Sequence, residues 1–267
     1  MNKDYFLRFN PSGRPGLGCR IFIRLWLLAM TLLMVEKCAG APAWPVPTNI
    51  LIHTEQHWIV ARNHYFNEPT NSVAAWQLGQ ACFAWGDLQT NRAQREILFT
   101  EGVTACRRSL ALNSNAAPAF YYLGMNLGKI ADLKRNLAAL GMVREVERCF
   151  AQARVLDETF SHAGPDRNLG LLYWEAPGWP LSVGNKKLAR KHLERAVDLA
   201  GAHPENRLNL AEAGVAWKDW ALITNQWAAL ERIWPAARTN LAGPDWEWDW
   251  LNWESRRAAL QRQMTSK

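Results

Sequence analysis

Apolar residues recur at three- and four-residue spacing along most of the chain, and the strict apolar–polar alternation of strands is nearly absent. One clear example follows Asn71, a helix-capping residue type, where Trp76, Leu78 and Cys82 return at helical spacing. The pattern therefore predicts an all-α fold. Helices are expected over residues 53–66, 72–86, 91–111, 117–134, 137–156, 166–175, 185–200, 205–217, 219–239 and 246–263.

Two short patterns repeat along the chain at intervals of 41 to 46 residues. A small residue on one helix lets a neighbouring helix approach closely, and a large residue one turn away fills the groove beside it. Two such helices per unit predict antiparallel hairpins that stack on one another. The first pattern is Leu78-Gly79, Leu123-Gly124, Leu169-Gly170 and Leu210-Ala211; the second is Gly102-Cys106-Ser109, Val146-Phe150-Ala153 and Ala189-Leu193-Ala196.

These spacings resemble the tetratricopeptide repeat over residues 72–216, although each unit here is longer than the usual 34 residues. The resemblance implies an α-solenoid, a stack of helical hairpins in which each unit contacts its neighbours.

Tryptophan is concentrated near the end of the chain, where residues 217–253 hold eight of the 15. Trp220, Trp227 and Trp234 step by seven residues along one helix face. The pattern predicts a Trp-rich helical cap whose rings pack on the last repeat. The alternative is an aromatic platform in a secreted glycan-binding protein, in which Trp248, on a different helix face from Trp250 and Trp253, is the first ring to test. Acidic residues flank that platform at Asp245, Glu247 and Asp249.

The segment Gly164–Pro180 reads as a helix followed by a connection rich in proline and glycine. It contains no cysteine or histidine, and Ser182 lacks the glycine setting of a nucleophile elbow. We interpret the segment as a joint between packed helices and the protein as non-enzymatic. Trp179, between Gly178 and Pro180, either fills the gap under its own loop or lines a ligand cavity between units.

Polar residues near the interface of the third and fourth units form the candidate ligand- or partner-binding site. An acid at the start of a helix complements its positive end, and buried guanidinium and amide groups need hydrogen-bond partners. These partners are either other groups of the protein, in a structural network, or a bound ligand. The candidate residues are Asp166, Arg167, Tyr173, Trp179, Asn206 and Arg207.

A narrower resemblance lies within the same region. The matching residues are Gly164, Pro165, Arg167, Leu169, Gly170 and Pro177, then Ala189, His192, Leu193 and Ala196, then Pro204, Asn206, Leu210, Ala211 and Glu212. This succession is similar to the T-component family of tripartite ATP-independent periplasmic (TRAP) transporters. The resemblance implies a periplasmic helical protein that binds a small ligand or a protein partner, such as a periplasmic solute-binding protein, as an accessory to transport.

The net charge of +7 is concentrated in residues 1–41, which carry +4. No run of five basic residues follows them, so nucleic-acid binding, which needs clustered cations, is excluded. The uncharged run Leu25–Val35 is too short to span a membrane and precedes small residues. This order predicts a secretory signal peptide and a secreted or periplasmic protein. An uncleaved signal that anchors the protein is the alternative, and peripheral membrane association stays open.

The cysteines and histidines suggest no cofactor. Cys82 and Cys106 lie in apolar helical patterns, and a disulfide between them stays open. His53 and His57 share a helix face, which is one geometry for a metal, but the sequence shows no converging carboxylate. We therefore expect a solvated face and no metal. The predicted organisation is a signal peptide over 1–41, an N-terminal helix and linker over 42–70, a repeat domain over 71–216 and the Trp-rich cap over 217–267.

Overall fold

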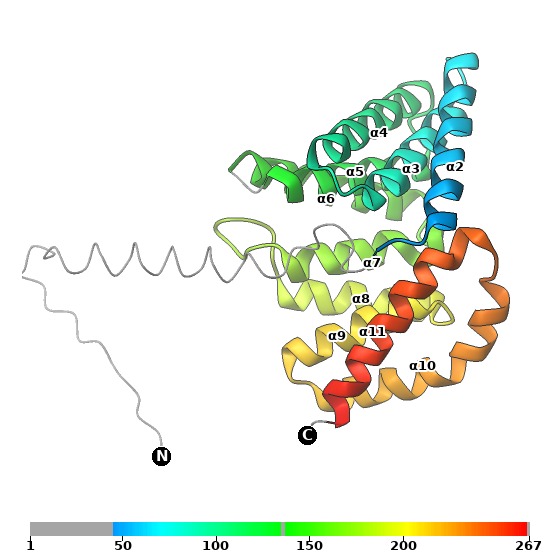
Figure 1. Cartoon of the computed structure of the whole chain (residues 1–267). Helices are drawn as coiled ribbons and strands as arrows, with labels where there is room; N and C mark the ends of the chain where they lie inside the picture. Colours follow the sequence, from blue (N-terminus) through cyan, green and yellow to red (C-terminus); the bar gives the residue numbers. More distant parts are fainter. Residues whose placement is uncertain (1–44, 135–136, 266–267) are drawn as a thin grey trace, which may run out of the picture. The chain divides into compact units, whose positions relative to one another are not determined.

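The computed structural model describes residues 45–134 and 137–265, which fold almost entirely into α-helices (Figure 1). Over these residues there is no β-strand, and one isolated bridge joins Gly178 to Gly184. The predicted all-α class is confirmed. The elements are α2 (Thr48–Asn67), α3 (Ser72–Leu88), α4 (Arg92–Leu112), α5 (Ala117–Lys134), α6 (Leu137–Leu156), α7 (Phe160–Glu175), α8 (Lys186–Ala200), α9 (Pro204–Trp217), α10 (Trp220–Asn240), the 3-10 helix η1 (Pro244–Trp246) and α11 (Glu247–Thr265).

The signal peptide predicted over residues 1–41 lies outside the described residues. Within the part that is described, none of the helices is both long and apolar enough to cross a membrane.

Local sequence signals account for several helix ends. The side chain of Asn71 accepts hydrogen bonds from the backbone N–H groups of Val73 and Ala74, as a capping residue does. Pro204 occupies the first turn of α9, where its missing N–H costs nothing. The expected helix ends agree with the observed ones to within two residues, except that α2 and α7 begin five and six residues earlier than expected.

Consecutive helices pair as hairpins, α3 with α4, α5 with α6, α7 with α8 and α9 with α10 (Figure 1). In the first three hairpins, the repeated glycine of one helix lies directly against the repeated larger residue of its partner. A side chain at any of these glycines would collide with the facing residue, so the sequence repeat corresponds to a repeated close approach of two helices. The contacts are Gly79 with Cys106, Gly124 with Phe150 and Gly170 with Leu193, where an added Cβ would lie 2.2, 2.9 and 2.7 Å from the nearest atom.

The two cysteines considered for a disulfide are free, and both are buried. The Sγ atom of Cys106 faces Gly79, and burial raises the pKa of its thiol well above the usual range. Cys106 therefore acts as a packing residue of the α3–α4 hairpin.

The tryptophans of the C-terminal helices turn mostly inward. Trp250 and Trp253 of α11 are buried, with ring centroids 5.0 Å apart, and Trp234 of α10 meets Trp250 edge-on at 5.2 Å. Trp248 is partly buried against a cluster that includes Ile50 of α2. The Trp-rich region is thus a helical cap, as predicted, and its rings contribute to packing.

The start of α11 reaches back to the first described helix (Figure 1). The Nδ2 atom of Asn49 in α2 donates to Oε2 of Glu247 in α11 at 2.6 Å. Further along, α11 packs against α9. The C-terminal helix therefore connects the two ends of the described stack. The domain boundaries expected at residues 42–70, 71–216 and 217–267 stay predictions.

Candidate functional site

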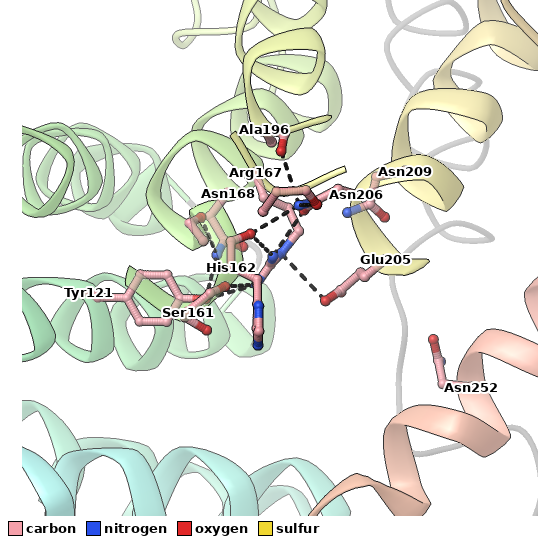
Figure 2. A network of polar contacts seen from close by, with 12 residues as sticks. Tyr121, Ser161, His162, Arg167, Asn168, Ala196, Glu205, Asn206, Asn209 and Asn252 are labelled. Atoms are coloured by element: carbon pink, nitrogen blue, oxygen red, sulfur yellow. Dashed lines mark hydrogen bonds and ion pairs between the residues drawn. The ribbon is translucent and has the colours of Figure 1, made fainter. Parts of the chain in front are cut away.

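The beginning of α7 contains three consecutive residues with left-handed backbone conformations. The φ angles are 52° at Ser161, 57° at His162 and 61° at Ala163. None is a glycine, so each costs about 1–2 kcal/mol in steric strain. The turn aims two carbonyl groups at Arg167, whose guanidinium donates to the oxygens of Ser161 and His162 at 3.2 and 3.1 Å (Figure 2). These charge-assisted bonds offset part of the strain.

Arg167 is only 5% exposed, and each of its three guanidinium nitrogens has a partner. Beyond the two carbonyls, Nη1 donates to Oδ1 of Asn206 at 3.0 Å and Nη2 donates to the hydroxyl of Tyr121 at 3.5 Å. Nε lies 3.4 Å from the carboxylate of Glu205. The side chain thus joins α5, α7 and α9 around one buried charge (Figure 2).

Asn206 completes this network from α9. It is 1% exposed, and its Nδ2 atom lies within hydrogen-bond distance of the carbonyl oxygens of His162, Ala196 and Ala200, at 3.0, 3.1 and 3.0 Å. These oxygens belong to the strained turn and to the C-terminal part of α8, and that of Ala200 also accepts from the N–H of His203 at 3.1 Å. One amide group therefore satisfies backbone groups from two other helices.

A titratable carboxyl group faces this network from α11. Burial and the charge of Glu205 raise the pKa of Asp249 to about 7, although Arg167 acts in the opposite direction. Burial by itself would lower the pKa of Arg167, but the nearby Glu205 and Tyr121 hold it above its ordinary value. The site thus combines a permanent positive charge with an acid that ionises near neutral pH.

His203 lies just before α9 and is 5% exposed. Its ring stacks on His162 with centroids 4.4 Å apart and meets Trp253 edge-on at 5.1 Å. Burial lowers the pKa of His203 to about 2, and the charges of Arg167 and His162 act in the same direction. His203 is therefore a neutral aromatic residue at physiological pH.

Asp166 forms a second, separate cluster. Its carboxylate is fully buried, accepts hydrogen bonds from Nε of Arg154 at 2.9 and 3.1 Å, and lies 2.7 Å from Nδ1 of His192. Nε of Arg195 lies 3.5 Å away. Because these partners come from α6 and α8, the carboxylate ties both helices to α7.

Tyr173 lies at the edge of the Asp166 cluster, with its ring 5.5 Å from that of His192, and Arg207 lies outside both clusters. The hydroxyl of Tyr173 donates to Glu147 at 2.7 Å, and burial raises the pKa of this tyrosine. Arg207 donates to the carbonyl of Gly201 at 2.6 Å and to the side chain of Gln226 at 3.1 Å. The six expected residues therefore do not converge on one point: Arg167 and Asn206 meet, Asp166 and Tyr173 both contact His192, and Trp179 and Arg207 lie elsewhere.

The structure corrects the expectation for Trp179, whose side chain is 89% exposed. The loop after α7 is closed by its own backbone, since the N–H of Gly184 donates to the carbonyl of Pro177 at 2.9 Å. Val183 is the loop residue that packs on the core. Trp179 consequently neither fills a gap nor lines an enclosed cavity; it projects from the surface beside Leu181, which is 66% exposed.

Two surface hollows of about 400 and 580 Å³ lie elsewhere, one bordered by α2, α10 and α11 and the other by α5 and α6. Neither is lined by any of the six expected residues. Arg167 and Asn206 have hydrogen-bond partners within the protein, as the interpretation of a structural network expects. A ligand role for these residues stays a prediction.

Sequence reasoning missed the titratable neighbours of Arg167, namely Glu205, His203 and Asp249. Glu205 adjoins an expected site residue, so its position next to Asn206 was an available signal. Asp249 was considered only as an acid beside the tryptophans. Nothing in a local pattern places it near Arg167, because the two are brought together by the return of α11.

The family model described as TRAP transporter T-component matches residues 81–216, just over half of the chain. The matched region extends from within α3 to near the end of α9 and includes the network of Arg167 and Asn206, the Asp166 cluster and the Trp179 loop. No curated protein matches the chain.

Proposed function

The chain belongs to the TRAP transporter T-component family, and on that premise we propose that it is a non-enzymatic accessory subunit that binds a protein component of such a transporter in the cell envelope. The family is one of transporter components, which supports a protein partner. The predicted signal peptide over residues 1–41 supports the location.

One observation carries the proposal: an exposed aromatic residue stands on a well-supported loop within the family-matched region. Trp179 is 89% exposed and Leu181 66% exposed. Tryptophan is among the residues most enriched at the energetic centres of protein interfaces, because a large ring loses much water-exposed area on binding. A surface tryptophan beside an exposed leucine therefore fits a docking point.

The loop is held at both ends, which favours binding because little order is lost. The N–H of Asn185 donates to the carbonyl of Tyr173 at 2.8 Å, and the side chain of Asn185 caps α8 by accepting from the N–H groups of Lys187 and Leu188. Toward the other end of the same hairpin, the buried Asp166 cluster joins α7 to α6 and α8. We infer that the internal polar clusters hold in place the hairpin that carries this loop.

The glycan-binding alternative receives less support. An aromatic platform needs open ring faces, but Trp250 and Trp253 are buried and Trp248 is partly buried against α2. We therefore do not propose a glycan as the ligand.

The test is a binding titration between the purified chain and the solute-binding component of a TRAP transporter from the same cell. Trp179→Ala should weaken binding about tenfold or more, as loss of an interface anchor does. Ile97→Ala is the matched control, because Ile97 of α4 is also exposed, at 67%, but lies on another helix pair. Equal binding by the wild type and Trp179→Ala would remove this loop from the interface.

A further inference from the structure

The first described helix carries two histidines that meet a carboxylate from the far end of the chain. Nε2 of His53 lies 2.8 Å from Oδ1 of Asp245, and Nδ1 of His57 lies 3.8 Å from the same oxygen. The two imidazole rings are 4.1 Å apart, because a spacing of four residues places them on one helix face. One donor atom from each of the three residues fits within a span of 4.8 Å.

The fold brings Asp245 to this position by a sharp turn after α10. Gly243 has a φ of 103°, a conformation that side-chain-bearing residues rarely adopt. The N–H of Trp246 donates back to the carbonyl of Gly243 at 3.0 Å, which forms the short helix η1 around Asp245. Beside it, Asn49 donates to Glu247 at 2.6 Å. The carboxylate is thus held against α2 by the backbone and by a neighbouring hydrogen bond.

The apolar layer beneath these residues supports the same contact. Ile50 of α2 is buried in a cluster with Trp85, and Trp248 and Leu251 of α11 pack on it. Because Ile50 precedes His53 by one turn and Trp248 follows Asp245 by one turn, this packing limits movement between the two elements. The three polar residues therefore face one another in a pre-organised arrangement.

Two imidazole nitrogens and a carboxylate oxygen form a ligand set for borderline divalent transition metals such as Zn²⁺, Ni²⁺ or Cu²⁺. Ligands about 2.0–2.2 Å from a tetrahedral ion stand roughly 3.3 Å from each other. The distances of 2.8 and 3.8 Å from the oxygen to the two nitrogens lie on either side of that value. Small side-chain rotations would therefore equalise them.

We propose that His53, His57 and Asp245 form a binding site for a divalent transition-metal ion, with Zn²⁺ as its representative. The side chains are 26%, 59% and 68% exposed, so the ion enters directly from solvent. Three protein ligands leave a fourth position open to water. The ion fastens α2 to the connection between α10 and α11, and so links the first described helix to the last. This site is independent of the Trp179 loop.

Calorimetric titration of the purified chain with Zn²⁺ tests the site. We expect one ion per wild-type chain, and about tenfold or greater weakening in both His57→Ala and Asp245→Asn. His64→Ala is the matched control: His64 lies on the same helix, 3.3 Å from the carboxylate of Glu68, but within the described residues it belongs to no group of three possible metal ligands. It should bind Zn²⁺ like the wild type.

Two further readouts separate metal binding from an ordinary hydrogen bond. Zn²⁺ should raise the unfolding temperature of the wild type and of His64→Ala, but not that of Asp245→Asn. Co²⁺ in place of Zn²⁺ should produce visible absorption bands that Asp245→Asn lacks. The proposal is overturned if the wild type takes up no stoichiometric ion, or if His57→Ala and Asp245→Asn, folded by circular dichroism, bind Zn²⁺ as tightly as the control.

Discussion

Arg167 of α7 donates a hydrogen bond from Nη1 to Oδ1 of Asn206 in α9, at 3.0 Å, and both residues are buried. The bond crosses from the third helical hairpin to the fourth. It is also the point where the strained turn at Ser161–Ala163, the end of α8 and the start of α9 meet. This pair therefore links the two hairpins through a buried polar contact.

Replacing Asn206 by alanine should destabilise the fold by about 3 kcal/mol. The change removes an acceptor from a buried guanidinium and leaves the carbonyls of His162, Ala196 and Ala200 without their amide partner. Urea unfolding followed by circular dichroism measures this. Asn63→Ala, at an exposed position of α2, should change stability by less than about 0.5 kcal/mol. A similar small effect at Asn206 would contradict its structural role.

Two glycines of α5 offer a test of the repeat itself. A Cβ at Gly124 would lie 2.9 Å from the ring of Phe150, whereas a Cβ at Gly128 would meet nothing within 4 Å among the described atoms. Gly124→Ala should therefore destabilise the protein by about 1–3 kcal/mol through overpacking. Gly128→Ala should stabilise it by about 0.5–1 kcal/mol, because alanine favours the helix. Thermal unfolding of both variants checks this, and equal effects would refute the close approach of α5 and α6.

The features that could be predicted from the sequence are those that depend on local periodicity, namely the helices and their pairing into hairpins. Gly79, Gly124 and Gly170 revealed the hairpin contacts because a repeated small residue has one simple explanation, a repeated close approach. The left-handed turn could not be predicted, since Ser161–Ala163 contain no glycine and the conformation depends on Arg167 and Asn206 binding its carbonyls.

The same limit applies to contacts made by the return of α11. The sequence showed His53 and His57 on one face but gave no reason to bring Asp245 beside them. The expected position of Trp179 was wrong for a related reason: a backbone hydrogen bond between Gly184 and Pro177 closes the loop without the ring. The positions of Asp245 and Trp179 both depend on contacts that form only in the folded chain, so no local sequence pattern indicates them.

Asp249 should make the protein less stable as the pH rises from about 4 to 7. Its carboxyl group has a pKa of about 7 in the folded state against about 3.9 in the unfolded chain. The folded state therefore holds more protons in this window, and its stability falls with increasing pH. Asp249→Asn should be about 2 kcal/mol more stable than the wild type at pH 8, with a smaller gain at pH 4.5. Asp198→Asn, at an exposed position of α8, is the control for loss of one charge. If the gain in stability of Asp249→Asn does not depend on pH, Asp249 is not a buried titrating group.

His203 should make the protein less stable as the pH falls below about 6.5, which is the opposite of the effect of Asp249. Its folded-state pKa of about 2 lies far below the unfolded value of about 6.5, so the unfolded chain binds more protons between these values. Stability contributed by the neutral ring is fully present above about pH 6.5 and is lost on acidification, by up to about 1.4 kcal/mol for each pH unit.

His203→Phe keeps an aromatic ring against His162 and Trp253 but cannot be protonated. Since Nδ1 of His203 has no hydrogen-bond partner in the described part of the chain, the substitution removes no bond at that atom. Urea titrations at pH 7, 6 and 5 should show a shallower loss of stability in His203→Phe than in the wild type. Trp179→Phe, which exchanges one non-ionising aromatic residue for another at an exposed position, should retain the wild-type slope. Asp249→Asn removes a group with the opposite pH dependence, so this variant should lose stability more steeply than the wild type as the pH falls. If stability falls equally with pH in all four proteins, His203 and Asp249 do not titrate beside Arg167.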